Sequence, residues 1–250
     1  MATESGTTAR EMCAAADEAL AEAAFRTGTF NAVAELFGQA LARARQDGDR
    51  EAEARAIGGL GATAHHRNIT RLVSDLRPLD ADVEAEEDLM REALAIWQEV
   101  GDAAGTARAL FGVGLVFQVL HRDWEAAMPY FWQAFGLAEA LEESGDLYGR
   151  SEVHRHLGFY YLYADVRPRE AVRQQGHSLA LRERLGDPRR IPSALVALGE
   201  AELAAGNPET AAEVTRRAAT LARSAGLLAW RVRDAEESLR RAEAALSPSG

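Results

Sequence analysis

The sequence predicts an all-α fold built as an array of stacked helix pairs. Two observations predict it: glycines that return at one fixed interval, and apolar residues that follow helical spacing. Four glycines each follow another glycine by 13 positions, in the pairs Gly48 and Gly61, Gly101 and Gly114, Gly145 and Gly158, and Gly186 and Gly199. A spacing kept four times is typical of a repeat that consists of helix, turn and second helix.

The residues within each unit favour helices over strands. In the third unit one buried helix face is marked at i, i+3, i+4 and i+7 by Leu110, Val113, Gly114 and Phe117. In the last unit Gly206 predicts a helix end, Asn207 a cap and Pro208 the first position of the next helix. No stretch shows the alternation of apolar and polar residues that a strand requires.

These units resemble tetratricopeptide (TPR) repeats of a bacterial variety with units of about 40 residues. In the last full unit the resemblance is carried by Leu195, Leu198, Gly199, Gly206, Pro208, Ala211 and Ala218, and in the third by Trp124, Ala127, Phe131 and Ala134. It implies a right-handed α-solenoid. HEAT-like repeats have similar periods and are the alternative, but small residues where two helices must cross closely favour the TPR fold.

We expect one continuous domain over residues 10–246, with about five helix pairs and a capping helix from residue 227. Residues 1–9 and 247–250 are expected to be flexible ends. The second unit is the longest and holds an insertion near 67–83. This insertion is interpreted either as an extension of the first helix, ended by Pro78, or as a short lid. Asp80 or Asp82 is expected to cap the helix that follows.

Composition excludes several classes of function. The net charge is −11, and the 28 basic residues are all Arg, interleaved with acidic residues rather than gathered in a basic stripe, so nucleic acid is not the expected partner. No signal peptide and no apolar run near 20 residues is evident, which predicts a cytoplasmic protein without membrane association. The absence of Lys and the heavy use of Ala indicate a bacterial source. Cys13 is the only cysteine, and no catalytic or metal-binding motif occurs, so neither a cofactor nor a metal is expected.

The stretch 154–172, HRHLGFYYLYADVRPREAV, concentrates polar and aromatic side chains. His154 falls on the buried face and is expected to be a core histidine with a hydrogen-bond partner. His156 lies about 200° around the helix, so the two histidines are not expected to bind one metal. Arg155, Phe159 and Tyr163 fall together on the opposite face.

In TPR proteins the corresponding face lines a concave groove that binds the partner. The same positions in all units give a candidate groove set: Arg55, His65, His66, Arg108, Phe111, Leu115, Gln118, Arg155, Phe159, Tyr163, Val196 and Glu200. Its basic and aromatic side chains suit an anionic or aromatic ligand. Under the other interpretation, these residues pair with neighbouring acidic groups and only solvate the surface.

The leading hypothesis is therefore a non-enzymatic binding module for a peptide, a protein partner or a small anionic ligand, with a role in regulation or assembly. The alternative is an enzyme that uses His65, Tyr163 and Glu200 for acid–base chemistry on a small substrate. Leu227, Leu228 and Trp230 are apolar residues at the terminal helix. If they are exposed, they predict a homodimer through that helix.

Overall fold

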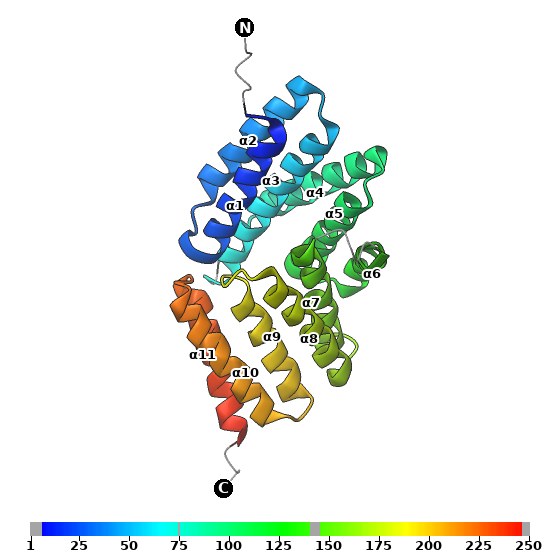
Figure 1. The fold of residues 1–250 in the computed structure, drawn as a ribbon. Coiled ribbons are helices and arrows are strands. Elements are labelled where there is room, and N and C mark those ends of the chain that lie inside the picture. The colour runs from blue at the N-terminus through cyan, green and yellow to red at the C-terminus, as the bar shows by residue number, and fades with distance from the viewer. Residues whose placement is uncertain (1–6, 75, 141–145, 247–250) are drawn as a thin grey trace. The chain divides into compact units, whose positions relative to one another are not determined.

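The computed structural model describes residues 7–74, 76–140 and 146–246. Over these residues the chain forms eleven α-helices, two short π-helical segments and no strand, which confirms the all-α prediction (Figure 1). The chain divides into two compact units, Met1–Leu137 and Ala138–Gly250. The prediction of one continuous domain stays a prediction.

The first unit is a succession of helices in which each packs on the next. Its elements are α1 (Ala9–Glu22), η1 (Ala23–Thr27), α2 (Phe30–Asp47), α3 (Arg50–Leu72), α4 (Asp80–Val100), α5 (Ala103–Leu115), η2 (Val116–His121) and most of α6 (Trp124–Ala140). Helix α3 also packs on α1 and α5. The first helices of successive repeats therefore form one layer of the unit.

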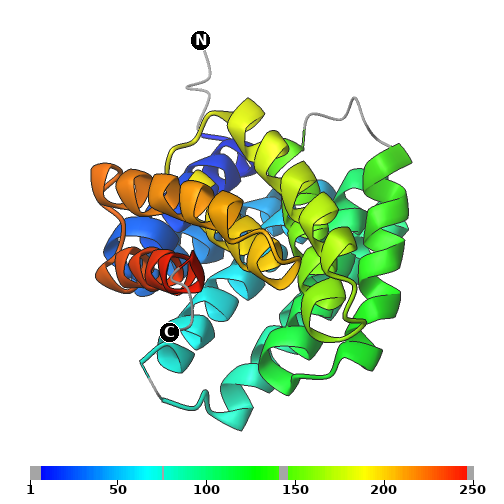
Figure 2. The ribbon, with the colours of Figure 1, turned by 90° about the horizontal axis from the view of Figure 1, so that it is seen from below.

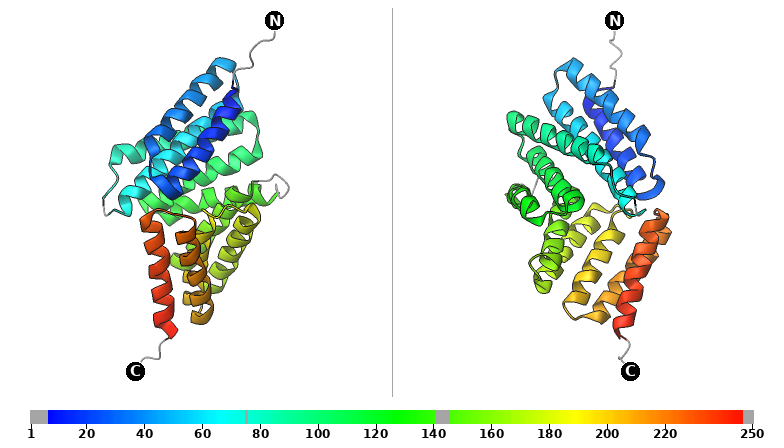
Figure 3. Two further views of the ribbon diagram at one scale, coloured as in Figure 1. Left: turned by 60° about the vertical axis from the view of Figure 1, so that its left-hand side comes forward. Right: turned by 180° about the vertical axis from the view of Figure 1, so that it is seen from behind.

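The second unit repeats this arrangement. Its helices are α7 (Leu147–Tyr163), α8 (Pro168–Leu185), α9 (Ile191–Ala204), α10 (Pro208–Ser224) and α11 (Ala229–Leu246). Figures 2 and 3 show α10 and α11, in orange and red, as an antiparallel pair. Helix α9 also packs on α7 and α11, so α7, α9 and α11 form the layer of first helices here.

The turn glycines do what their spacing predicts. Gly48, Gly101, Gly186, Gly206 and Gly226 all have φ between 63° and 82°, the left-handed conformation that closes a helix at little steric cost to glycine. Gly145 lies outside the described residues.

The predicted caps are only partly right. Pro208 occupies the first turn of α10 and Asn207 occupies its N-cap position, both as predicted. The Asn207 side chain makes no capping hydrogen bond with α10, and its NH2 group donates to Glu202 at 2.7 Å. Asp80 and Asp82 lie in the first turn of α4, whose cap position is Leu79. The expected Asp cap is therefore wrong, although acidic groups in a first turn still favour the helix dipole.

The second glycine of each pair marks a helix crossing. A Cβ atom added there would meet a side chain of the partner helix: Met90 for Gly61, Phe131 for Gly114, Gln175 for Gly158 and Thr215 for Gly199. The added atom would lie 2.6 Å from Phe131 at Gly114, closer than real Cβ atoms approach other atoms. The glycines therefore let the two helices of a repeat come close together.

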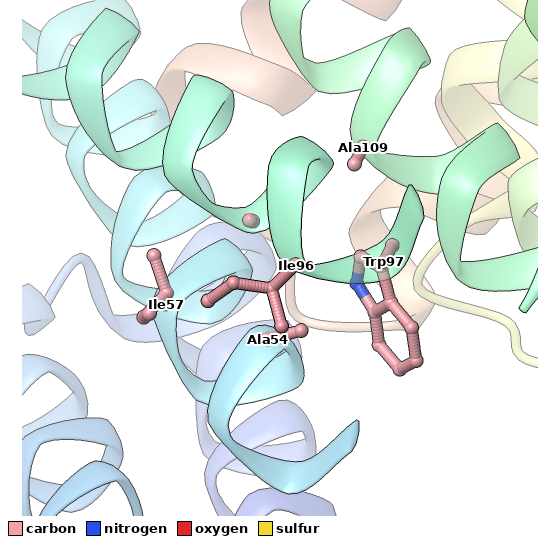
Figure 4. Close-up of a cluster of buried hydrophobic side chains, with 6 residues drawn as sticks. Ala54, Ile57, Ile96, Trp97 and Ala109 are labelled. Atoms are coloured by element: carbon pink, nitrogen blue, oxygen red, sulfur yellow. The ribbon is translucent and has the colours of Figure 1, made fainter. Parts of the chain in front are cut away.

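Between these crossings the core is apolar and rich in alanine. Figure 4 shows one cluster in which Ala54 and Ile57 of α3 face Ile96 and Trp97 of α4, with Ala109 of α5 nearby. Such a core has no single centre. Each helix pair is buried by its neighbours, as a repeat fold requires.

The insertion in the second repeat begins as helix. Helix α3 continues to Leu72, so it does not reach Pro78. The connection to α4 exposes Val73, Leu76 and Leu79, and the Arg71 guanidinium donates to the Arg77 carbonyl at 3.2 Å. The first part of the insertion therefore extends the helix, and the remainder is a short connection.

One helical stretch, Ala103–His121, is long and apolar enough to cross a membrane by length and composition alone. This corrects the expectation that no apolar run approaches that length. Core helices of soluble proteins pass the same test, and packing explains the composition here. Gly105 lies against Trp97, and Gly112 against the Met90 sulfur.

Candidate binding face

Two histidines were predicted to line a groove in the second repeat, and the structure places one of them in the interior. His65 is 5% exposed, and its Nδ1 lies 2.6 Å from Oε1 of Glu86, which is fully buried. Asn68 donates to the other Glu86 oxygen at 2.8 Å. His65 is thus part of a buried polar cluster between α3 and α4. The lengthened α3 brings this turn against α4. The prediction that His65 lies on an open groove face is therefore wrong.

The other predicted residues of the first unit lie in separate environments. Arg55 forms an ion pair with Asp17 of α1 at 2.5 Å, as the solvated-surface interpretation predicts. The half-buried His66 ring stacks parallel to Phe30 at 6.2 Å, and the Phe111 ring contacts Phe131 at 5.6 Å. The remaining three are the exposed Arg108 and the half-buried Leu115 and Gln118.

In the second unit the predicted residues come together. The Arg155 guanidinium lies over the Phe159 ring at 4.7 Å from its centroid, and the Phe159 and Tyr163 rings stack at 6.0 Å. The three residues are spaced at i, i+4 and i+8 on α7, which aligns them along one side of the helix. Tyr163 is 58% exposed, so a large ring faces solvent at the end of the stack. We call Arg155, Phe159, Tyr163 and Glu200 the Arg155 face.

Glu200 joins this face from α9. The Tyr163 hydroxyl donates to Glu200 Oε2 at 3.0 Å, and Arg241 of α11 contacts Glu200 Oε1 at 3.2 Å. Burial raises the pKa of the Tyr163 phenol, and the nearby Glu200 charge raises it further. Tyr163 therefore stays protonated at neutral pH and acts as a hydrogen-bond donor. Val196, also predicted here, is buried in α9.

Helix α11 adds charged and aromatic groups that sequence reasoning missed. The Arg231 guanidinium lies over the Trp230 ring at 4.2 Å. Burial, with a smaller contribution from the Arg155 charge, lowers the pKa of Arg231 to about 10. Burial also raises the pKa of the Asp234 carboxyl, and Glu200 adds to this effect. The signal was the stretch AWRVRD, but the sequence analysis interpreted α11 as a capping helix and Trp230 as a dimer contact.

The half-buried Arg155 and the fully buried Arg182 have opposite surroundings. Arg182 is 1% exposed, pairs with Glu152, and donates to the Arg190 carbonyl at 2.8 Å and to Ser193 Oγ at 2.6 Å. Arg155 makes no side-chain ion pair or hydrogen bond with any described residue, and its buried Nε has no acceptor. Burial lowers the pKa of Arg155. Arg182 therefore holds helices together, whereas the Arg155 charge has no such structural partner.

The histidines of α7 belong to the interior. His154 is 6% exposed, with Nδ1 at 2.7 Å from Gln174 Oε1 and Nε2 at 3.4 Å from Glu139, so the predicted core histidine with a partner is confirmed. Burial lowers the pKa of His154. His156 is also buried, and its ring contacts the Phe159 ring edge-on, with the ring centroids 5.6 Å apart. This contact helps to hold Phe159 in its position in the stack.

The homodimer prediction required exposed apolar side chains at the terminal helix, and the structure does not show them. Leu227 is 9% exposed, and Leu228 and Trp230 are half-buried, because α11 packs on α9 and α10. The expected exposure of these three residues is therefore wrong. A dimer through this helix would need other contacts.

The three residues of the enzymatic alternative are not brought together within either unit. His65 belongs to the first unit, and its ring is bonded to Glu86, while Tyr163 and Glu200 bond to each other in the second. Over the described residues no group of three or more His, Cys, Asp or Glu side chains could hold a metal ion. The geometry that the structure does assemble, cationic and aromatic side chains side by side, is suited to binding.

No family model and no curated protein matches the sequence. Among solved structures, the chain is similar to BtubC (BKLC) from P. vanneervenii at 21% identity, covering 86% of this chain and 80% of that one, with a TM-score of 0.58. It is also similar to two structures of nearly identical TPR-like repeats named for a kinesin light chain of Podosopora anserina. These have 15% and 14% identity, TM-scores of 0.50 and 0.51, and coverage of 85% of this chain and 93% of theirs. At these identities the likeness shows the fold alone.

Proposed function

The chain is a helical-repeat protein with the TPR-like fold, and we propose that it is a non-enzymatic binding module whose Arg155 face holds a peptide or protein partner. Regulation or assembly in a bacterial cytoplasm is the role that suits such a module. TPR-like folds generally serve protein–protein interaction.

The observation that carries this proposal is the stack of Arg155, Phe159 and Tyr163. Arg155 is half-buried, and an arginine with no ion-pair partner contributes little to stability, because partial removal from water disfavours its charge. A tyrosine ring that is 58% exposed likewise buries little apolar area. Aromatic and arginine side chains are the residue types that contribute most at protein interfaces. A partner that covers this stack would bury the ring and neutralise the charge.

The layer of first helices extends the surface that a partner could contact. Because α9 packs on both α7 and α11, the polar groups of Arg155, Glu200 and Arg241 come from three adjacent helices of one layer. Helical repeats present extended binding surfaces in this way, and an extended segment laid across them would meet several repeats.

The test is affinity capture from a lysate of the source organism, with the wild type beside Arg155→Ala/Phe159→Ala. The matched control is Arg233→Ala/Arg240→Ala, which removes two exposed arginines of α11 in the same unit. We expect one partner to be captured by the wild type and the control, and to be lost from the Arg155/Phe159 variant. Capture that is equal in all three proteins, with unchanged circular dichroism melts, would refute the assignment to this face.

Phe159 also packs inside the unit, so its loss could act through folding. Tyr163→Ala provides a second variant, because this ring is largely exposed and its only described hydrogen bond is to Glu200. We expect Tyr163→Ala to weaken capture at least several-fold while the melting temperature changes little. A change in melting temperature without a change in capture would indicate a structural role only.

A further inference from the structure

Exposed apolar side chains of the first unit gather at the connection between α3 and α4, which is cyan in Figure 2. Val73, Leu76 and Leu79 are 43%, 55% and 58% exposed. In the rest of the described part of this unit, Leu36 and Trp132 are the other large apolar side chains with comparable exposure. A single exposed leucine is ordinary, but a group within a few positions is typical of a surface that another molecule covers.

The repeat scaffold does not require this connection. It spans seven residues, against four between α7 and α8 and three between α9 and α10, which join the helix pairs of later repeats. A connection that only links two helices is normally polar, because its side chains remain in water. Val73, Leu76 and Leu79 therefore bury little apolar area within the unit, and their composition is unexplained by the fold.

Charged side chains of both signs flank these apolar residues. Arg71 lies in the last turn of α3, Arg77 lies in the connection, and Asp80 and Glu84 follow in the first two turns of α4. None of the four forms an ion pair with a described residue, and the Arg71 guanidinium donates to the Arg77 carbonyl. Arginines elsewhere on α2 and α3 do pair with carboxylates, as Arg43, Arg45, Arg50 and Arg55 show.

The arrangement of these charges is self-complementary. The cations lie at the end of α3 and within the connection, and the anions lie at the start of α4, which packs on α3. A two-fold rotation about an axis through the connection places the basic side of one copy opposite the acidic side of the other. Two arginines against two carboxylates leave no excess of either sign, so charge complementarity favours a second copy over a strongly acidic or basic partner.

We propose that this surface is the interface of a homodimer in which the α3–α4 tips of two copies meet about a two-fold axis. The α3–α4 tip consists of Arg71, Val73, Leu76, Arg77, Leu79, Asp80 and Glu84. The apolar side chains of the two copies bury each other, and the arginines of each copy face the carboxylates of the other. This inference goes beyond the proposed function, because the tip belongs to the first unit and the Arg155 face to the second.

The experiment is sedimentation equilibrium of the full chain from about 1 μM to about 1 mM. We expect a monomer–dimer equilibrium with a dissociation constant on the order of 10–100 μM, because a contact at the end of one helix pair is small for a specific interface. Leu76→Ser/Leu79→Ser should raise this constant at least tenfold. Leu36→Ser, which changes an exposed leucine of α2, is the matched control and should leave it unchanged. Circular dichroism melts verify that each variant is folded.

Charge reversal tests the two-fold arrangement. Arg71→Glu/Arg77→Glu makes the tip acidic, and Asp80→Arg/Glu84→Arg makes it basic. Each variant alone should dimerise at least tenfold more weakly than the wild type, because like charges then face each other. An equal mixture of the two variants should form a heterodimer, because each basic side again faces an acidic one. If the wild type dimerises but this mixture does not associate, the inference is overturned.

Other outcomes assign the tip to a different occupant. A wild type that is monomeric at every concentration overturns the inference, and so does a dimer that Leu76→Ser/Leu79→Ser leaves unchanged. If the monomer instead binds vesicles of phosphatidylglycerol and phosphatidylcholine, and this variant does not, the tip is a membrane contact. The Arg155→Ala/Phe159→Ala variant should dimerise as the wild type does, so failure of the dimer and failure of the proposed function are separate results.

Discussion

The Arg155 guanidinium lies 4.7 Å from the centroid of the Phe159 ring, and no described carboxylate forms an ion pair with it. Arg155→Met should therefore leave the stability of the protein unchanged or raise it. Loss of the cation–π contact costs about 1 kcal/mol, and removal of a half-buried charge that has no ion-pair partner offsets that cost. The measurement is the urea midpoint followed by circular dichroism. A midpoint that fell as far as a core truncation would show that Arg155 has a structural partner.

Arg182→Met should behave in the opposite way. This side chain is 1% exposed, pairs with Glu152, and donates to Ser193 and to the Arg190 carbonyl. Its replacement leaves Glu152 without its cation and two acceptors without a donor, so we expect a loss of about 3–5 kcal/mol. The same urea titration measures it. If Arg182→Met were as stable as Arg155→Met, the distinction between a structural and a binding arginine would fail.

Gly199→Ala should destabilise the second unit, because the new methyl group would overlap the Thr215 side chain. Thr215 is fully buried and β-branched, so it has little freedom to move, and we expect a loss of about 1–3 kcal/mol. Gly176→Ala in α8 is the matched control, since nothing lies within 4 Å of its added Cβ. In Gly176→Ala, the higher helix propensity of alanine should stabilise the protein by about 0.5–1 kcal/mol. Differential scanning calorimetry of both variants checks the signs.

Asn68→Ala should weaken the first unit by about 1–3 kcal/mol, because one oxygen of the fully buried Glu86 would lose its donor. Asn31→Ala removes an exposed asparagine and serves as the control. The measurement is the protection of backbone amides from hydrogen exchange in α3 and α4, the helices that carry Asn68 and Glu86. Equal protection in both variants would show that water replaces the lost donor.

The buried His154 should make the folded protein less stable in mild acid. Because burial lowers its pKa in the folded state, the unfolded chain takes up the proton first as the pH falls below the ordinary histidine value of about 6.5. Stability is therefore fully present above that pH and declines as the pH falls toward the folded-state pKa. His154→Gln should reduce this decline between pH 7 and pH 5. Melting curves at pH 8, where His154 is neutral in both states, measure the effect of the substitution on packing alone. If the stability of His154→Gln declined between pH 7 and pH 5 as much as that of the wild type, the assignment of this decline to His154 would be contradicted.

Much of the fold could be predicted from the sequence because glycine spacing reports directly on backbone geometry. The left-handed turns at Gly48 and Gly186 and the close crossings at Gly114 and Gly199 are local requirements that few other residues meet. The alignment of Arg155, Phe159 and Tyr163 followed from helical periodicity alone. Their contacts with each other are as expected from that spacing.

What could not be predicted depends on which helix packs against which. His65 and Asn68 became buried because α3 is longer than its counterparts and meets Glu86 of α4. The contribution of Arg231 and Trp230 depends on α11 packing against α9, a helix that ends 25 residues before α11 begins. One cap prediction also failed, since Leu79 and neither Asp80 nor Asp82 occupies the cap position of α4. Periodicity within one helix carries no information on these long-range contacts.

The central claim is that the Arg155 face contacts a partner, and site-specific photocrosslinking tests it most directly. The photoreactive residue p-benzoylphenylalanine is placed at Tyr163, where the ring is 58% exposed, and separately at the exposed Arg240 as a control. In a lysate of the source organism, the Tyr163 position should give one dominant cross-linked species that Arg155→Met abolishes, and the Arg240 position should not give it. Equal cross-linking from both positions, or none from Tyr163, would contradict the account.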